Sequence, residues 1–293
     1  MTKRSILAAL FGTILLGAAG SCAVSWQLSR PVPARIGPPP PDLESEQVVF
    51  RSDSGSLIRG WLSRGAPRGG IALLLPGIRA NRLSMVGRIR FLRTAGYSTL
   101  AIDFQASGES PGDMITFGWR ERFDVIAAVR LLKEKIPGEP IAIIGASLGG
   151  AAALFAAPEL DVHALILEAV YPSFDVAVEN RLRIRLGAIG AAFAPLLLAQ
   201  VRPRLGVWPS DLKPVDRIAL LRCPVLVIGG ARDRHTTPAD TRRLYDAARP
   251  PKELWMIDDA DHGDFLSAGG KVYERRVLAF LAAALRAERR GRP

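Results

Sequence analysis

Short apolar runs alternate with longer amphipathic stretches over most of the chain. Apolar runs of four to six residues recur at 71–76, 98–102, 140–145, 164–167, 225–228 and 253–257. Helix-length segments separate them, and the clearest are 81–94 and 117–136. Continuous apolar runs of this length are typical of parallel strands buried on both faces. The pattern therefore predicts an α/β domain with a mostly parallel sheet and helices on both faces.

A different pattern precedes the first apolar run. Residues 47–52 and 57–63 alternate between apolar and polar positions, and the turn-forming sequence Asp53-Ser54-Gly55-Ser56 separates them. Alternation of this kind predicts two half-buried strands joined as an antiparallel hairpin. We expect this hairpin at an edge of the sheet.

The N-terminal residues form a separate apolar segment. After Lys3 and Arg4, no charged residue occurs from Ser5 to Ser29. An apolar helix of about 22 residues is roughly 33 Å long, which is enough to cross a bilayer. We expect residues 1–29 to be a membrane anchor. The alternative is a cleaved signal, because the small residues before Cys22 resemble a cleavage site or an imperfect lipoprotein box.

The residues around this segment predict its orientation. Because basic residues precede it, the positive-inside rule places the N-terminus in the cytoplasm and the α/β domain outside it. Six prolines lie in 31–42, as in a stiff polyproline II spacer. We therefore expect a single-pass membrane protein with a Pro-rich linker at 30–45 and an extracytoplasmic domain at 46–293.

The segment at 141–150, IAIIGASLGG, combines a strand, a tight turn and an alanine-rich helix. This order is typical of a nucleophile elbow, which presents a serine on a strained turn between strand and helix. Gly145 and Gly149 leave room where a side chain would obstruct that turn. Ser147 is the predicted nucleophile, at a helix N-terminus where free amides and the helix dipole favour developing negative charge.

Two later loops supply the predicted acid and base. A nucleophile elbow is typical of α/β-hydrolases, in which the catalytic serine, acid and histidine follow the chain order Ser, Asp, His. Asp233 comes shortly after the run 225–228, and His262 shortly after the run 253–257. We expect His262 to take the proton from Ser147, and Asp233 to fix the imidazole tautomer and stabilise its cation.

Other residues are weighed for the same roles. Glu168, at the end of the run 164–167, is the alternative acid. His163 begins a predicted strand, which is the wrong end of the sheet for catalysis, and His235 is predicted to be a loop or pocket residue.

Oxyanion stabilisation needs two backbone amides, and we expect them from Leu148 and from Ile78 in the loop after the run 71–76.

Composition narrows the remaining function classes. The formal net charge is +11, and arginine supplies 33 of the 39 basic residues, but these arginines are scattered along the chain. We expect no nucleic-acid partner, since recognition needs a clustered basic face. Two cysteines and three histidines build neither a disulfide framework nor an ordinary zinc site. No metal or other cofactor is expected.

Several motifs together carry a resemblance to a known family. Gly77 with Asn81-Arg82, the stretch 103–110, the elbow, and the Asp233 and His262 loops resemble the membrane-anchored α/β-hydrolase-domain serine hydrolases and their bacterial serine-aminopeptidase-like relatives. The resemblance covers about 47–285. It implies the α/β-hydrolase fold, with an eight-stranded, mostly parallel sheet and a short helical lid, and esterase, thioesterase or lipase-like activity. This chain departs from the family at Pro76, usually histidine, and at Gln105, usually arginine.

The expected lid is the insertion at 171–221. It combines Arg181, Arg183 and Arg185 with the apolar run 186–198, followed by Arg202 and Arg204. A helix that packs its apolar face on the domain explains this pattern. The alternative is an apolar acyl pocket with a basic rim that faces anionic lipids or an acidic substrate.

The predicted function is hydrolysis of a carboxylic ester or thioester of a small molecule or lipid, through an acyl-Ser147 intermediate. An acyltransferase or a small-peptide peptidase with the same triad is an alternative. A non-catalytic, membrane-tethered binding module is an alternative from another class. The physiological substrate and the oligomeric state stay open.

Overall fold

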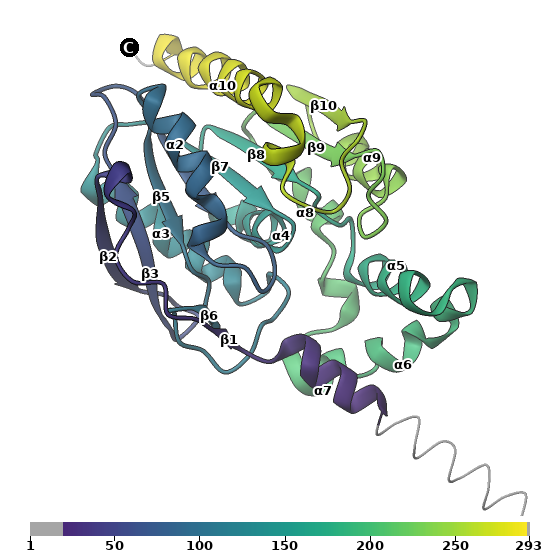
Figure 1. Cartoon of the computed structure of the whole chain (residues 1–293). Coiled ribbons are helices and arrows are strands. Elements are labelled where there is room, and N and C mark those ends of the chain that lie inside the picture. The colour runs from purple at the N-terminus through teal and green to yellow at the C-terminus, as the bar shows by residue number, and fades with distance from the viewer. Residues whose placement is uncertain (1–19, 292–293) are drawn as a thin grey trace, which may run out of the picture.

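The computed structural model describes residues 20–291 of the chain and contains one eight-stranded sheet with helices on both faces (Figure 1). The strand order is β10-β9-β8-β7-β4-β5-β3-β2. The strands are β2 (Ser45–Arg51), β3 (Leu57–Ser63), β4 (Ile71–Leu75), β5 (Ser98–Ile102), β7 (Ile141–Ala146), β8 (Ala164–Glu168), β9 (Val225–Gly230) and β10 (Lys252–Ile257). Neighbours from β10 to β5 pair in parallel, and the hairpin β2–β3 joins β5 in antiparallel pairing at one edge. The sheet and its edge hairpin are confirmed as predicted.

Two hydrophobic cores lie on opposite faces of this sheet. Side chains of a strand alternate between faces, so Leu73 joins one core while Leu74 joins the other. The first core includes residues of α3 (Glu121–Lys135), α4 (Leu148–Ala156), α8 (Pro214–Ile218) and α9 (Pro238–Ala247). The second includes residues of α2 (Val86–Thr94) and α10 (Phe265–Gly291).

Two predicted helices begin later than their hydrophobic pattern indicates. The segment 117–136 becomes helical only at Glu121, because Phe117 and Gly118 take positive φ angles of 54° and 96°. The Glu121 carboxylate accepts hydrogen bonds from the amides of Thr116 (2.8 Å) and Gly118 (2.9 Å), which fixes the turn before the helix. The segment 81–94 starts as the 3₁₀ turn η2 (Arg82–Met85) before α2.

A helical insertion, residues 171–221, connects β8 to β9 and lies to one side of the sheet (Figure 1). Besides α8 it contains α5 (Phe174–Leu186), α6 (Ala194–Leu198), α7 (Val201–Leu205) and the 3₁₀ turns η4 (Ala188–Phe193) and η5 (Pro209–Asp211). Because parallel strands end at the same edge, the insertion begins where β7 also ends, close to the elbow.

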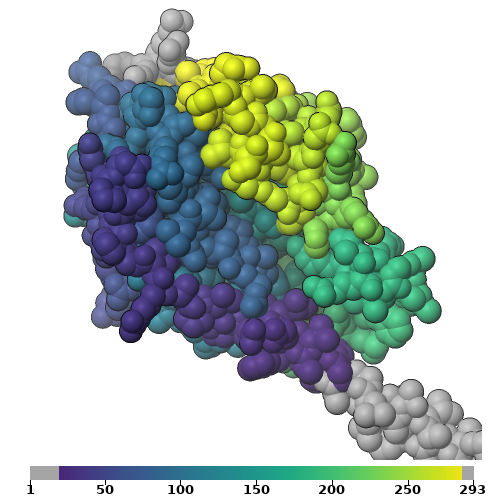
Figure 2. Space-filling model, viewed as in Figure 1, coloured from purple at the N-terminus to yellow at the C-terminus, as the bar shows by residue number. Residues whose placement is uncertain are grey.

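Residues 20–29 are helical and pack on this insertion, as the contact between purple and green surfaces in Figure 2 shows. The Ser21 hydroxyl donates to the Leu196 carbonyl at 2.8 Å, and Arg204 donates to the Cys22 carbonyl at 3.4 Å. No helix within residues 20–291 combines the length and apolar character needed to cross a bilayer. The predicted single-pass anchor and membrane location are corrected accordingly, since residues 20–29 are held by protein contacts. Residues 1–19 of that prediction lie outside the described residues.

The Pro-rich segment also lies on the domain and does not extend away from it as a spacer. In β1 (Val32–Pro33), Val32 donates to the Ala106 carbonyl at 2.8 Å, and the strand pairs in parallel with β6 (Ser107–Gly108). Leu43, the last residue of the 3₁₀ turn η1 (Pro41–Leu43), is fully buried in the same core as Trp61. These contacts hold the segment on the domain, although Pro40 itself keeps a polyproline II-like conformation with a φ of −50° and a ψ of 136°.

Candidate active site

Ser147 lies at the turn between β7 and α4. Its φ of 46° is unusual for a residue with a side chain, and its amide donates to the Glu168 carbonyl at 2.7 Å. Such a conformation costs about 1–3 kcal/mol and persists only where the surroundings enforce it. A Cβ on residue 145 would lie 2.6 Å from the Gly150 nitrogen, and one on residue 149 would lie 2.4 Å from the Leu75 carbonyl oxygen. The turn therefore requires glycine at both positions, as the sequence predicts.

Asp233 and His262 are brought together from two different loops. The His262 Nδ1 atom lies 2.8 Å from Asp233 Oδ2. The other carboxylate oxygen, Oδ1, accepts hydrogen bonds from the amides of His235 (2.7 Å) and Thr236 (2.8 Å). The Asp233 side chain is completely buried. These contacts fix the carboxylate, so the imidazole bonded to it has a defined orientation and presents Nε2 away from the acid.

The end of β8 links this pair to the serine turn. Glu168 accepts from Ser147 as described, and the next residue, Ala169, donates to the Ile228 carbonyl at 3.0 Å. The Ala169 carbonyl in turn accepts from the Thr236 hydroxyl at 3.1 Å. Within residues 20–291, no hydrogen bond joins the Ser147 hydroxyl to His262. Hydrogen bonds between a nucleophile and its base commonly shorten only when substrate binds.

Glu168, the alternative acid, is engaged by a different cation. Arg88 donates to Glu168 Oε2 at 2.6 Å, and the Tyr273 hydroxyl donates to Oε1. Burial lowers the pKa of Arg88, but the combined interactions with Glu168, Tyr273 and Asp264 outweigh it and raise that pKa overall. Arg88 also lies 3.0 Å from Asp264, two residues after His262. Glu168 therefore belongs to a buried ion-pair network beneath the site, and no local sequence signal marks Arg88 or Tyr273 as its partners.

The two other histidines differ in position. His163 lies at the start of β8, where its amide donates to the Ile141 carbonyl at 2.7 Å, far along the sheet from the serine turn. His235 lies beside the candidate base, with ring centroids 4.9 Å apart. Burial lowers the pKa of His235, and the neighbouring His262 and Arg181 lower it further. His235 thus favours the neutral form next to His262.

The two predicted oxyanion donors face the same space as the serine. Leu148 is the first residue of α4, where an amide has no partner within the helix. The Ile78 amide donates to no backbone acceptor within the described chain. A Cβ on residue 77 would lie 3.8 Å from the Cβ of Ser147, so the loop containing Ile78 passes directly over the serine.

A cavity of about 60 Å³ lies beside Ser147 and is mostly apolar. Its walls are Leu28, Ile78, Phe117, Ser147, Leu148, Tyr171, Phe174, Ala177, Val178 and Arg181. A smaller cavity of about 30 Å³ shares Leu28, Phe117, Phe174 and Val178 with it and continues toward α6 and α7. No pattern in the sequence marks Leu28 or Phe117 as part of this site, because only the folded chain places them beside the serine.

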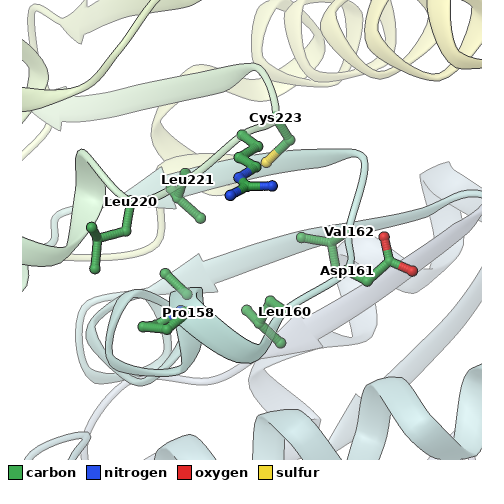
Figure 3. Close-up of a pocket in the computed structure, with 9 residues that line it drawn as sticks. Pro158, Leu160, Asp161, Val162, Leu220, Leu221 and Cys223 are labelled. Carbon is green, nitrogen blue, oxygen red and sulfur yellow. The ribbon is translucent and has the colours of Figure 1, made fainter.

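A larger cavity of about 530 Å³ lies at the amino ends of β8 and β9 (Figure 3). Its lining includes Pro158, Leu160, Asp161, Val162, Leu221 and Cys223. Burial raises the pKa of the Cys223 thiol to about 11, which makes it a poor nucleophile. This cavity is at the end of the strands opposite to Ser147. Within the described part of the chain, no cluster of three or more His, Cys, Asp or Glu side chains is arranged to hold a metal ion.

Comparisons with known proteins agree with this architecture. The model of the Alpha/beta hydrolase family matches residues 72–275. The alpha/beta hydrolase domain-containing protein WAV2 of Arabidopsis thaliana is 31% identical over 264 residues, which are 85% of this chain and 80% of WAV2. The uncharacterized protein YqkD of Bacillus subtilis is 25% identical over 243 residues, 82% of this chain and 80% of YqkD.

Among solved structures, an esterase of Pyrococcus furiosus superposes with a TM-score of 0.73 at 23% identity, covering 88% of this chain and 98% of the esterase. An esterase of Exiguobacterium antarcticum superposes with a TM-score of 0.61 at 16% identity, covering 81% of this chain and all of that one. At these identities the similarity establishes the shared fold.

Proposed function

Because the chain belongs to the alpha/beta hydrolase family, we propose that it is a serine hydrolase that cleaves carboxylic esters or thioesters through an acyl-Ser147 intermediate. The observation that carries this proposal is the 2.8 Å contact between His262 Nδ1 and Asp233 Oδ2, on the same edge of the sheet as the serine turn. A buried carboxylate that orients an imidazole is the arrangement needed to activate a serine hydroxyl.

Each residue has a role in the proposed reaction. The Ser147 hydroxyl attacks the substrate carbonyl carbon while His262 accepts its proton. Asp233 stabilises the resulting imidazolium, and the amides of Leu148 and Ile78 donate to the oxyanion. The C–O or C–S bond then breaks, and His262 gives the proton to the leaving alcohol or thiol. Water attacks the acyl-serine in the same way, with His262 as base, and releases the carboxylic acid.

The size of the cavity beside Ser147 favours substrates with short acyl groups. Its volume of about 60 Å³ is well below the roughly 150 Å³ at which an apolar protein cavity accommodates benzene. The adjoining space of about 30 Å³ lies behind shared apolar side chains. A short aliphatic acyl chain fits the first space, and longer chains require these shared side chains to move.

A fluorophosphonate probe tests the proposal, because it phosphonylates only activated serines. We expect labelling of the unmodified protein and none of Ser147→Ala, together with loss of p-nitrophenyl butyrate hydrolysis. Ser84→Ala is a matched control, since Ser84 is exposed and bonds only to the Asn81 carbonyl. Absence of labelling in the unmodified, folded protein would contradict the proposal and favour a non-catalytic role.

A further inference from the structure

Arg181 of α5 is a cation in the wall of the cavity that contains the candidate nucleophile. It lines this cavity together with Ser147 and the candidate oxyanion donors Ile78 and Leu148. Its one side-chain hydrogen bond within residues 20–291 goes from Nη1 to the Ala177 carbonyl at 2.9 Å, one turn back in the same helix. A guanidinium has five N–H groups, so most of its donors have no partner in the described protein.

Two other arginines of the chain, unlike Arg181, pair with a carboxylate. Arg88 pairs with Glu168 at 2.6 Å, and Arg183, two residues after Arg181, pairs with Glu179 at 3.2 Å. No carboxylate lies within ion-pair distance of Arg181 in the described residues. Asp233 attracts it electrostatically, but that carboxylate is occupied by His262 and two amides.

The surroundings of Arg181 disfavour an uncompensated charge. Burial lowers the pKa of Arg181, and the attractions of Tyr171 and Asp233 do not restore it. Placing a cation among apolar groups costs free energy unless an anion or hydrogen bonds compensate it. Leucine or methionine would fill this wall without that cost. Arg181 is only partly buried, and none of its unpaired nitrogens is fully enclosed, so these donors are open to a group that enters the cavity.

We propose that Arg181 binds a carboxylate carried by the substrate, so that the preferred substrates are acidic esters or thioesters and not neutral ones. The planar guanidinium matches a carboxylate in geometry and charge, and it can donate two parallel hydrogen bonds to it. This inference rests on the proposed function, because it assigns the substrate class of the same site. The carboxylate is either at the far end of the acyl chain or on the leaving group.

Matched esters separate these two positions. The first pair is mono-p-nitrophenyl glutarate and p-nitrophenyl pentanoate, which differ in a carboxylate on the acyl side. The second pair is 4-acetoxybenzoate and phenyl acetate, which differ in a carboxylate on the leaving group. We expect the unmodified protein to prefer the acidic member of one pair, and that pair identifies the position.

Arg181→Gln is expected to lower the ratio of kcat/KM for the acidic over the neutral ester by about tenfold or more, mainly through KM. Arg181→Lys should retain part of this preference, because it keeps the charge but loses the planar guanidinium that donates two parallel hydrogen bonds. Arg183→Gln is the matched control and should keep the full ratio. An unchanged ratio in Arg181→Gln, or an equal loss on both esters, overturns the proposal.

A binding measurement keeps the inference testable apart from catalysis. Glutarate and 4-hydroxybenzoate, the acidic products of the two pairs, are added separately during thermal unfolding. We expect at least one of them to raise the Tm of the unmodified protein and of Arg183→Gln, but not of Arg181→Gln. If no ester is hydrolysed but this difference persists, the proposed function fails and the anion site stands. If neither acid raises the Tm of any variant, the anion site fails whatever the esterase result.

Discussion

His262 contacts the Asp233 carboxylate through Nδ1 at 2.8 Å, and Asp233 holds this position with two backbone amides on its other oxygen. Replacing the acid by an amide retains the shape but removes the charge that stabilises an imidazolium. We therefore expect Asp233→Asn to lower kcat for p-nitrophenyl butyrate by about 10³- to 10⁴-fold. Steady-state kinetics measure this, with circular dichroism to verify the fold. A loss below tenfold would show that Asp233 is not the catalytic acid.

Glu168→Gln is expected to lower stability and to leave kcat nearly unchanged. The change leaves the buried Arg88 with only the half-exposed Asp264 as a counterion, and breaking a buried ion pair costs up to about 3–5 kcal/mol of folding free energy. Urea unfolding should show this destabilisation, while the surviving folded protein keeps most of its kcat. If the variant is fully stable but inactive, the carboxylate at residue 168 acts in the chemistry itself.

Leu28 is expected to influence acyl-chain length. It lies in the wall shared by the two cavities near Ser147. Leu28→Ala should raise kcat/KM for hexanoate relative to acetate esters by about tenfold, and Leu28→Trp should lower it, since a methylene in an apolar pocket is worth about 1–3 kcal/mol. Val24→Ala is the control on the same helix, because Val24 is exposed. An identical chain-length profile in all four proteins would mean that residue 28 does not contact the acyl chain.

Two glycines near the serine turn should differ in their tolerance of alanine. A Cβ on residue 149 would lie 2.4 Å from the Leu75 carbonyl oxygen, whereas one on residue 77 would meet nothing closer than 3.7 Å. We expect Gly149→Ala to destabilise the protein by about 1–3 kcal/mol or more, because backbone must move. Gly77→Ala should have nearly unchanged stability. Equal Tm values for the two variants would contradict the tight geometry of the elbow.

The stability of the fold should depend on pH through Asp124. Burial raises the pKa of this carboxyl from 3.8 to about 7, and hydrogen bonds from the Gln105 amide and the Ser52 hydroxyl offset that effect only in part. Between these pH values the unfolded chain releases the proton while the folded chain retains it. The free energy of unfolding should therefore fall as pH rises from about 4 to 7, by about 4 kcal/mol from this group. Urea titrations at several pH values measure the slope, and Asp124→Asn should flatten it. A slope as steep in Asp124→Asn would assign the effect to other groups.

Local pattern was sufficient to predict the framework of this protein. The apolar runs became β4, β5, β7, β8, β9 and β10, and the alternating segments became the edge hairpin, because burial follows from side-chain periodicity. The glycines around Ser147 indicated the elbow for a local reason too, since backbone carbonyls come too close for any Cβ. The loops of Asp233 and His262 were predicted because ligands bind at the carboxyl ends of parallel strands, and the folded chain brings these two side chains into contact.

Long-range contacts distinguish groups that these patterns leave alike. Glu168 ends one buried strand and Asp233 follows another, and their partners differ: His262 for Asp233, and Arg88 and Tyr273 for Glu168. The apolar stretch before Ser29 suits a bilayer and a protein groove equally, since both exclude water. Residues 20–29 of it lie on the insertion. Hydrophobicity and charge are properties of a residue and its neighbours in sequence, whereas the partner that each group meets depends on how distant segments pack.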